Sequence, residues 1–192
     1  MRVIAGSARG RRLKGPPTRK AGNWTPTVRP TSDMLKGALF SALNALDTDI
    51  THVVDLYAGT GALGIEALSR GAEWCDFVER NSGMARVIQA NLKVTGLDSR
   101  AAVHTGDITR VVPALEPGVT LILADPPYDD TEAWPTMAKL AATTVFDRVT
   151  ATIAVEHSSR GDAPASLAQF RLRKTIKHGD GAVAIYVASD DN

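Results

Sequence analysis

The sequence predicts an α/β fold with a doubly wound, mostly parallel sheet. From residue 52 to residue 156, short stretches of strand character alternate with amphipathic helical stretches, which is typical of this fold class. Residues 119–124 form an apolar run, as expected of a central strand that is buried on both faces. Two late strand-like segments flank Gly179-Asp180-Gly181, and this turn predicts an antiparallel C-terminal hairpin.

Local signals place each element in order along the chain. Thr31 or Ser32 can cap a first helix, because apolar residues recur at three- and four-residue spacing from Met34 to Leu46. Gly96 stands where the C-terminal cap of a later helix is expected. The later helices are expected at residues 61–70, 82–95, 109–115 and 131–142. The seven expected strands cover residues 52–56, 74–79, 101–105, 119–124, 152–156, 170–177 and 182–187.

Basic residues are concentrated at the start of the chain. Residues 1–32 carry eight basic and no acidic side chains, whereas the remainder carries 14 basic against 21 acidic side chains. The formal net charge of +1 therefore hides a strong asymmetry. A basic segment joined to an acidic body favours a polyanionic partner, because each Lys or Arg on a phosphate releases a counterion. A solubilising or disordered tail is the alternative.

The basic segment has an internal pattern. Residues 2–5 and 11–14 flank the glycine-containing stretch 6–10, which predicts a small basic β-hairpin. Residues 15–30 are rich in Pro and Gly, so they are expected to run extended over the surface. We therefore expect two parts, a hairpin and linker at residues 1–30 and the α/β domain at residues 31–192.

A glycine-rich loop follows the first expected strand. Gly59, Gly61 and Gly64 give the pattern G-x-G-x-x-G between a strand and a helix, where glycines let the backbone turn sharply and approach a ligand. Glu79 ends the second strand, where a carboxylate can accept both hydroxyls of a ribose. These features fit NAD as well as S-adenosylmethionine (SAM), and a glycine-rich turn without a ligand is the alternative.

Two further carboxylates favour SAM over NAD. Asp55 stands at the strand tip before the loop, where it would repel a pyrophosphate but attract the amino group of a methionine moiety. Asp107 follows the third strand, where it can accept a hydrogen bond from the adenine amino group. Asp107 is equally well explained as the N-cap of the helix that follows.

Asp125-Pro126-Pro127-Tyr128 follows the fourth strand, at the sheet edge where doubly wound folds bind ligands. The prolines lack backbone donors, which leaves the Asp125 carboxylate and the Pro126 carbonyl as acceptors for an aromatic NH2 group. Tyr128 can stack on the ring that carries the amine. Holding both N–H groups would aim the lone pair of a weakly nucleophilic amine at a methyl donor. A proline turn with a buried tyrosine is the alternative.

The chain resembles the RsmD family of class I SAM-dependent methyltransferases. Asp-Pro-Pro-Tyr is the catalytic motif of enzymes of this class that act on amino groups of nucleic-acid bases. The resemblance is carried in order by residues 1–6, 9–13, 29–33, 55–71, 125–128 and 155–158. It implies a seven-stranded Rossmann-like fold and methylation of a guanine N2 in 16S ribosomal RNA, within a partly assembled 30S particle.

The resemblance also implies roles for individual residues. Asp125, Pro126, Pro127 and Tyr128 would position the guanine amine. Cofactor contacts are expected from Thr31, Asp55, Tyr57, Gly59, Gly61, Glu79, Arg80, Asp107 and Ile108. RNA contacts are expected from Arg2, Arg9, Arg11, Arg12, Lys14 and Arg29. Two departures from the family pattern concern regions expected to face RNA: His178 stands where an aromatic residue is expected, and the linker at residues 19–25 is longer than typical.

Several single residues limit the alternatives. The lone cysteine, Cys75, excludes a disulfide framework, and its place far from the fourth-strand loop argues against cytosine-C5 methylation by a thiolate. We expect it in the core. His157 either contacts ligand or lies in a solvated loop, and Trp134 and Tyr57 either border the pocket or pack in the core.

The expected protein is a cytoplasmic monomer that needs no metal. No signal segment or membrane-length apolar run is visible. A DNA base amino-group methyltransferase is one rival, although no second domain that could bend a duplex is evident. A non-catalytic RNA-binding assembly factor is another, and the intact Asp125 and Glu79 argue against it. A dehydrogenase that uses NAD is the third.

Overall fold

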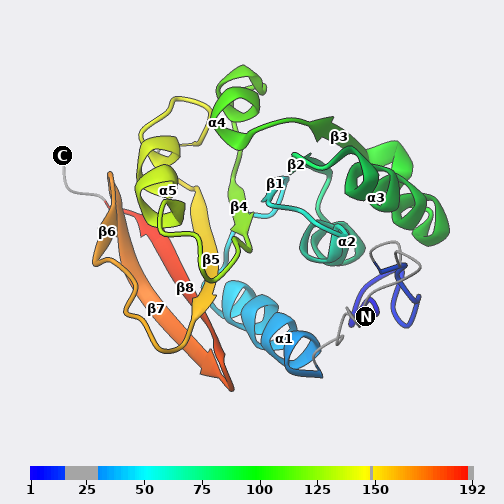
Figure 1. Ribbon diagram of the computed structural model, residues 1–192, viewed down its shortest axis with the longest axis horizontal. Coiled ribbons are helices and arrows are strands. Elements are labelled where there is room, and N and C mark those ends of the chain that lie inside the picture. Colours follow the sequence, from blue (N-terminus) through cyan, green and yellow to red (C-terminus); the bar gives the residue numbers. More distant parts are fainter. Residues whose placement is uncertain (16–29, 148, 190–192) are drawn as a thin grey trace.

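The computed structural model describes residues 1–15, 30–147 and 149–189, and it confirms a Rossmann-like α/β fold (Figure 1). One sheet has the strand order β3-β2-β1-β4-β5-β8-β7-β6. β1 to β5 are parallel, and β8 runs antiparallel to both β5 and β7. The strands are β1 His52–Leu56, β2 Trp74–Glu79, β3 Ala101–Thr105, β4 Leu121–Ala124, β5 Thr152–Ser158, β6 Ser166–Leu167, β7 Phe170–His178 and β8 Gly181–Ala188.

Helices cover both faces of this sheet. The longer α-helices are α1 Pro30–Ala45, α2 Ala62–Ser69, α3 Ser82–Thr95 and α5 Ala133–Ala141, and the short helices are α4 Ile108–Val111, η1 Asp98–Arg100 and η2 Val112–Ala114. α1, α2 and α3 pack on one face, where Leu35, Ile65 and Ile88 belong to one core. α4 and α5 pack on the other face, where Ile108 and Met137 belong to a second core. Burial on both faces explains why β4 is apolar throughout.

The expected elements are present, with four differences. The expected count of seven strands is one too low, because β6 has only two residues and is too short for an alternating pattern to show. Val119 lies outside β4 and forms an isolated bridge with Phe146. The expected helix at 109–115 is split into α4 and η2, since Pro113 lacks a backbone donor. α1 begins at Pro30, so Thr31 and Ser32 lie in its first turn rather than before it.

The N-terminal residues form the expected hairpin and pack tightly against the helices. Arg2 and Arg12 form one antiparallel bridge, and Val3 N–H donates to the Arg11 carbonyl at 3.0 Å. Val3, Ala8 and Leu13 are buried in the core under α1, α2 and α3. The expected extended linker at residues 15–30, with Arg29, lies outside the described residues except at its ends.

Gly6 is required at the tip of this hairpin. Its φ is +81°, and an added Cβ would come within 1.7 Å of the Ser69 carbonyl oxygen. The hairpin therefore approaches the end of α2 more closely than any other residue type allows. No helix in the described part of the chain is long and apolar enough to cross a membrane.

Candidate functional site

The glycine-rich loop joins β1 to α2 and adopts a left-handed backbone. Gly59 and Gly61 have φ of +54° and +78°, and Tyr57 between β1 and Gly59 also has a positive φ of 55°. A non-glycine residue in this region is strained and often marks a functional site. Gly64 has a different role, because an added Cβ would lie 2.4 Å from Phe77 Cε1. Gly64 thus allows α2 to pack closely on β2, as the third glycine of such loops does.

Asp55 lies beneath this loop and is 1% exposed. Its Oδ2 accepts a hydrogen bond from Gly64 N–H at 2.8 Å. Burial raises the pKa of Asp55 well above its usual value, and the nearby carboxylates Asp125 and Glu79 raise the pKa further, although the Gly64 hydrogen bond lowers it. The Asp125 and Glu79 carboxylates therefore add negative charge around Asp55, which favours a cationic ligand there.

Glu79 connects the end of β2 to the glycine-rich loop. Its Oε2 accepts from Gly59 N–H at 2.9 Å, and its Oε1 accepts from Asn81 N–H at 2.7 Å. Each carboxylate oxygen has a second lone pair, so these bonds hold the side chain in place without excluding a ligand hydroxyl. The structure brings Glu79 and the loop together, as the sequence analysis expects.

Asp107 is the N-cap of α4. Its Oδ1 accepts from Thr109 N–H at 2.9 Å and from Thr109 Oγ1 at 2.6 Å. These two hydrogen bonds lower the pKa of Asp107, with Arg110 and Arg80 adding to the effect. Asp107 also lines the larger of two cavities at this edge of the sheet. Its role as the N-cap of α4 is therefore compatible with the expected contact to the adenine amino group.

Two adjoining cavities lie along the carboxyl edge of the parallel strands. The larger has a volume of about 640 Å³, and the smaller about 160 Å³. The larger is lined by Tyr57, Val78, Glu79, Arg80, Gly106, Asp107, Ile108, Thr109, Asp125, Pro127, Asp129, Asp130, Glu132 and Thr136. The smaller is lined by Met1, Asp33, Lys36, Asp55, Tyr57, Ala58, Gly59, Thr60, Ala62, Leu63, Asp125 and Glu156. Tyr57 and Asp125 line both cavities, so they stand at the junction.

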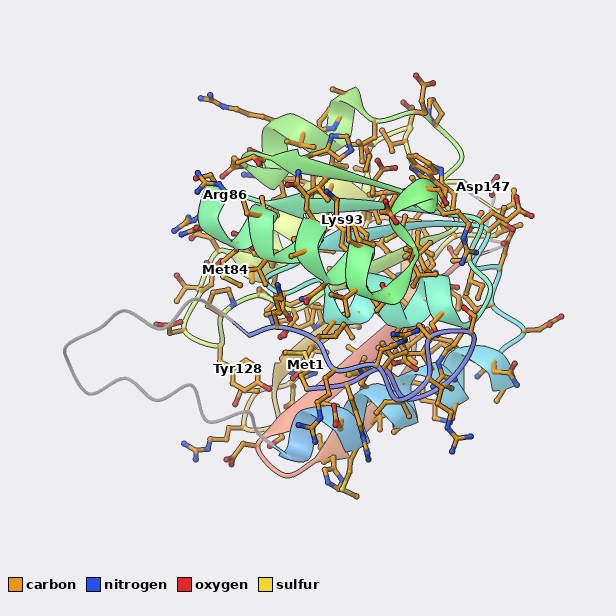
Figure 2. All side chains as sticks on the ribbon, turned by 90° about the vertical axis from the view of Figure 1, so that its right-hand side faces the viewer. Met1, Met84, Arg86, Lys93, Tyr128 and Asp147 are labelled. Carbon is orange, nitrogen blue, oxygen red and sulfur yellow. The ribbon has the colours of Figure 1, made fainter. Side chains whose placement is uncertain are left out.

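In the Asp-Pro-Pro-Tyr loop, Asp125 lines both cavities and Pro127 lines the larger one, whereas Pro126 and Tyr128 line neither. Asp125 is exposed to solvent and Pro126 is buried. The Tyr128 hydroxyl donates to Glu156 Oε1 at 2.9 Å, across from the end of β5. In Figure 2, Tyr128 lies at the opposite end of the molecule from Asp147, which precedes β5. The catalytic motif expected from the sequence therefore lies at the ligand-binding edge of the sheet.

Several further residues line the smaller cavity without having been expected there, and Glu156, Lys36 and Met1 are the most informative of them. Glu156 could have been found from its position near the carboxyl end of β5. Lys36 is 5% exposed, and its Nζ donates to the Arg2 carbonyl at 2.8 Å. Met1 reaches the glycine-rich loop, where its Sδ accepts from Thr60 Oγ1 at 3.4 Å. Neither Lys36 nor Met1 has a sequence signal, because both depend on how the hairpin docks.

The single residues left open by the sequence analysis are now placed. Cys75 is buried in the core, and burial raises the pKa of its thiol. His157 lies inside β5 and is 8% exposed, so the alternative of a solvated loop is wrong. Trp134 packs edge-on against His157 and Tyr186, at ring distances of 5.4 and 6.3 Å. Trp134 is therefore a packing residue, whereas Tyr57 borders both cavities.

The expected RNA-contacting residues of the hairpin are on the surface. Arg2, Arg9, Arg11, Arg12 and Lys14 are all exposed. Arg2 lies 3.8 Å from Asp33. Arg29 and the side chain of Thr31 lie outside the described residues. No cluster of three or more metal-binding side chains occurs in the described ranges of the chain.

The donor set fits SAM. Asp55, Glu79 and Asp107 present carboxylates to the two cavities, and the left-handed Gly59 borders the smaller one. This arrangement suits a ligand with a cationic amino group, a sulfonium, a ribose and an adenine. The raised pKa of Asp55 reflects burial first, and the negative charges of Asp125 and Glu79 add to it against the opposing Gly64 hydrogen bond. A bound cation would relieve that repulsion. The Arg80 side chain and the apolar Ile108 lie in the same larger cavity.

Comparisons with known proteins identify relatives of the chain. Residues 1–187 match the family described as Conserved hypothetical protein 95. The chain is 34% identical over 189 residues to YlbH of Bacillus subtilis, covering 97% of this chain and 98% of that protein. It is 30% identical over 128 residues to Ribosomal RNA small subunit methyltransferase D of Escherichia coli, covering 67% and 60%.

Solved structures show the same fold. The yhhF protein of Escherichia coli superposes with a TM-score of 0.80 at 26% identity, covering 98% of this chain and 97% of that chain. A Streptococcus pyogenes protein superposes with a TM-score of 0.70 at 27% identity, covering 79% and 96%. From the family match over nearly its full length and the site geometry, the chain belongs to the Conserved hypothetical protein 95 family, the RsmD family of SAM-dependent methyltransferases.

Proposed function

We propose that this protein transfers a methyl group from SAM to the exocyclic N2 amine of a guanine in 16S ribosomal RNA, within a 30S assembly particle. The observation that carries the proposal is the place of Asp125, which lines both cavities at the junction between them. A cofactor that spans both cavities, from Asp55 in the smaller to Glu79 and Asp107 in the larger, would pass beside this carboxylate, which could then hold a target amine next to it. The name of the Escherichia coli relative supports ribosomal RNA as the substrate.

The chain's own residues orient the amine. When bound, SAM supplies an electrophilic methyl group. Asp125 and the Pro126 carbonyl accept the two N–H groups, which aims the nitrogen lone pair away from the loop. The nitrogen would form the new bond to the methyl carbon as the carbon–sulfur bond breaks, with the sulfur keeping the electron pair of that bond. One amine proton would then pass to solvent. Asp125 stabilises the positive charge that develops on the nitrogen, and Tyr128 stacks on the base.

Cofactor contacts are proposed for the residues that line the two cavities. Asp55 faces the amino group, Glu79 the ribose, and Asp107 the adenine. Gly59 lines the smaller cavity and allows close approach of the backbone, whereas Gly61 lines neither cavity and is proposed for its left-handed turn in the same loop. Tyr57, Arg80 and Ile108 complete the walls. Thr31 joins this set by its position at the start of α1.

Phosphate contacts are proposed for the basic segment at residues 1–30, with residues 31–192 forming the methyltransferase domain. Arg2, Arg9, Arg11, Arg12 and Lys14 are exposed on the hairpin, and Arg29 extends the set. Met1 at the start of the hairpin lines the smaller cavity, so RNA bound by the hairpin would lie beside the site. We further propose a monomer that acts in the cytoplasm without a metal.

The central test offers labelled SAM to unmethylated 16S RNA, to 30S particles lacking the modification, and to duplex DNA. We expect label in guanine N2 of the ribosomal substrate. Asp125→Ala should lower turnover by about 100-fold or more, as loss of a group that stabilises transition-state charge does. The matched control is Asp98→Ala, which removes an exposed carboxylate from η1 and should leave turnover unchanged.

Three outcomes would overturn the proposal. Label found only in adenine, or only in DNA, would indicate a different methyltransferase. Full activity in the Asp125→Ala variant would remove the proposed role of the loop. If the Asp125→Ala variant lost methyl transfer but still supported 30S assembly fully, the protein would be better described as a non-catalytic assembly factor.

A further inference from the structure

A second basic surface lies on β7, far along the chain from the N-terminal hairpin. β7 has the sequence Phe-Arg-Leu-Arg-Lys-Thr-Ile-Lys-His and contains no acidic residue. Arg171, Arg173, Lys174 and Lys177 are all exposed. This strand holds four of the 14 basic side chains that follow residue 32. The acidic body of the protein therefore contains one concentrated positive stripe, defined here as these four residues.

The local structure of β7 explains why the stripe is continuous. The pairing with β8 shifts between Leu172 and Lys174, which marks a β-bulge at Arg173. A bulge interrupts the alternation of side chains between the two faces, and residues 173–175 are consecutively exposed. Phe170 is buried in the second core and Ile176 packs against the first. Apolar residues thus anchor the strand while the cations remain in solvent.

The charge of the stripe is not neutralised within the protein. Of the ion pairs found among the described residues, none involves the stripe. Four unpaired cations on one strand make an exposed surface that favours a polyanion. None of the large exposed apolar residues in the described ranges lies on β7, so the stripe lacks the apolar side chains with which a protein inserts into a membrane surface.

The stripe leads to the catalytic loop. His178 ends β7 and pairs with Gly181. A Cβ added to Gly181 would lie 2.9 Å from the Tyr128 hydroxyl, so the end of the hairpin directly abuts the Asp-Pro-Pro-Tyr loop. In Figure 1, β7 and the N-terminal hairpin lie on opposite sides of α1. Met1 of the N-terminal hairpin lines the smaller cavity, and β7 ends beside the Asp-Pro-Pro-Tyr loop, so the two basic surfaces adjoin the site from different sides of α1.

We propose that the β7 stripe binds the phosphate backbone of the ribosomal RNA on the side of the target base opposite to the N-terminal hairpin. This inference rests on the proposed function. Two basic surfaces on one substrate act as linked binding modules, so each raises the effective concentration of RNA at the other. They would hold the RNA on both flanks while the base enters the site between them.

The test compares two double variants of the full chain that remove the same charge. Arg173→Gln with Lys174→Gln neutralises the centre of the stripe. Lys93→Gln with Lys139→Gln neutralises two exposed lysines on α3 and α5. Binding of unmethylated 16S RNA is measured from low to moderate salt. We expect the stripe variant to reduce the slope of log K against log salt by about 2, or about 1 per lost phosphate contact, and to weaken binding by at least about threefold.

The remaining measurements separate this inference from general effects. In the stripe variant, the melting temperature, the SAM affinity and the turnover at saturating RNA should match those of the wild type. If the control variant lowers the salt slope as much as the stripe variant does, the stripe has no specific role. The same conclusion follows if the wild type methylates the RNA and the stripe variant keeps the wild-type salt slope. If the stripe variant lost binding to anionic lipid vesicles but bound RNA as the wild type does, the proposal would be overturned in favour of a membrane surface. A wild type that neither binds nor methylates ribosomal RNA would instead overturn the proposed function and this inference with it.

Discussion

The protein has two basic hairpins, one at each end of the chain, and they are held in place by different means. The N-terminal hairpin has a single strand-type bridge, between Arg2 and Arg12. The hairpin of β7 and β8 has a long antiparallel ladder and continues the main sheet through the pairing of β8 with β5. The first is therefore attached mainly through side chains of the body, and the second mainly through backbone hydrogen bonds.

Four buried polar side chains attach the N-terminal hairpin. Lys36 Nζ donates to the Arg2 carbonyl at 2.8 Å. Glu66 accepts from Ile4 N–H at 2.8 Å and from Ala5 N–H at 3.0 Å. Ser69 Oγ accepts from Ala8 N–H at 2.9 Å. Asn91 binds both backbone groups of Lys14. A hairpin held this way depends on individual side chains, whereas one held by a ladder tolerates substitution of its exposed residues.

The largest expected effect follows from substitution of Glu66. This carboxylate is 0% exposed and forms ion pairs with Lys36 at 3.3 Å and Arg70 at 2.8 Å. Glu66→Ala should lower the free energy of unfolding by about 3–5 kcal/mol, because it leaves the Lys36 charge buried without its partner. Urea denaturation measures the change. Replacing Glu66 and Lys36 together by Met should recover much of the loss, and a cost below about 1 kcal/mol for Glu66→Ala would show that the hairpin does not depend on this residue.

Asn91 connects the hairpin to the cofactor loop. It is 0% exposed, and its Nδ2 donates to the Lys14 carbonyl at 3.1 Å and to the Thr60 carbonyl at 2.9 Å. Asn91→Leu should cost about 1–3 kcal/mol, since it leaves buried backbone groups without partners. It should also weaken SAM binding, because Thr60 lies between Gly59 and Gly61.

Calorimetry and amide exchange at Lys14 and Leu13 test this prediction. The control is Gln169→Leu, which removes one hydrogen bond from Gln169 Nε2 to the Ala141 carbonyl at 2.9 Å, next to β7. It should leave SAM affinity unchanged. If Asn91→Leu and Gln169→Leu changed SAM affinity equally, the N-terminal hairpin would have no special connection to the cofactor loop.

The same contrast explains how much the sequence predicts. The C-terminal hairpin is predicted correctly, because the two strand-like segments and the Gly179-Asp180-Gly181 turn between them are local signals. The glycine-rich loop, Glu79 and Asp125 are also found at the expected edge, because strand order brings the carboxyl ends of parallel strands together. These signals depend only on neighbouring residues and on general rules of topology.

The docking of the N-terminal hairpin could not be predicted. It depends on contacts such as Ile4 to Glu66, which are 62 residues apart in the sequence, and no local pattern encodes them. For the same reason the sequence shows neither that Met1 lines the smaller cavity nor that Lys36 is buried beside Glu66. The β-bulge at Arg173 was missed because a one-residue shift in pairing leaves no signal in the strand.

Gly181 is the position where the C-terminal hairpin should be sensitive. An added Cβ would lie 2.9 Å from Leu35 Cδ2 and 2.9 Å from the Tyr128 hydroxyl. Gly181→Ala should therefore cost about 1–3 kcal/mol through overpacking and should lower turnover by displacing Tyr128. Thermal unfolding and methyl transfer to 16S RNA are measured together. Gly161→Ala is the matched control, since nothing lies within 4 Å of its Cβ position; equal losses in both variants would contradict the proposed contact.

The smallest expected effect concerns Lys177 on β7 and the buried His157 on β5. Burial lowers the pKa of His157 below 6.5, the Ser158 backbone and Asp162 oppose this, and Lys177 lowers it further. Because the folded pKa is depressed, the stability contributed by the neutral imidazole is complete above pH 6.5 and is lost as the pH falls through the folded pKa.

Lys177→Gln should raise the pKa of His157 and reduce this loss. An NMR titration of the His157 ring measures the shift, and Lys174→Gln, at an exposed position of the same strand, should leave the pKa unchanged. If His157 titrates identically in both variants, the side chain of Lys177 does not influence the core. β7 would then act on the core only through its backbone hydrogen bonds, unlike the N-terminal hairpin, which is attached by side chains.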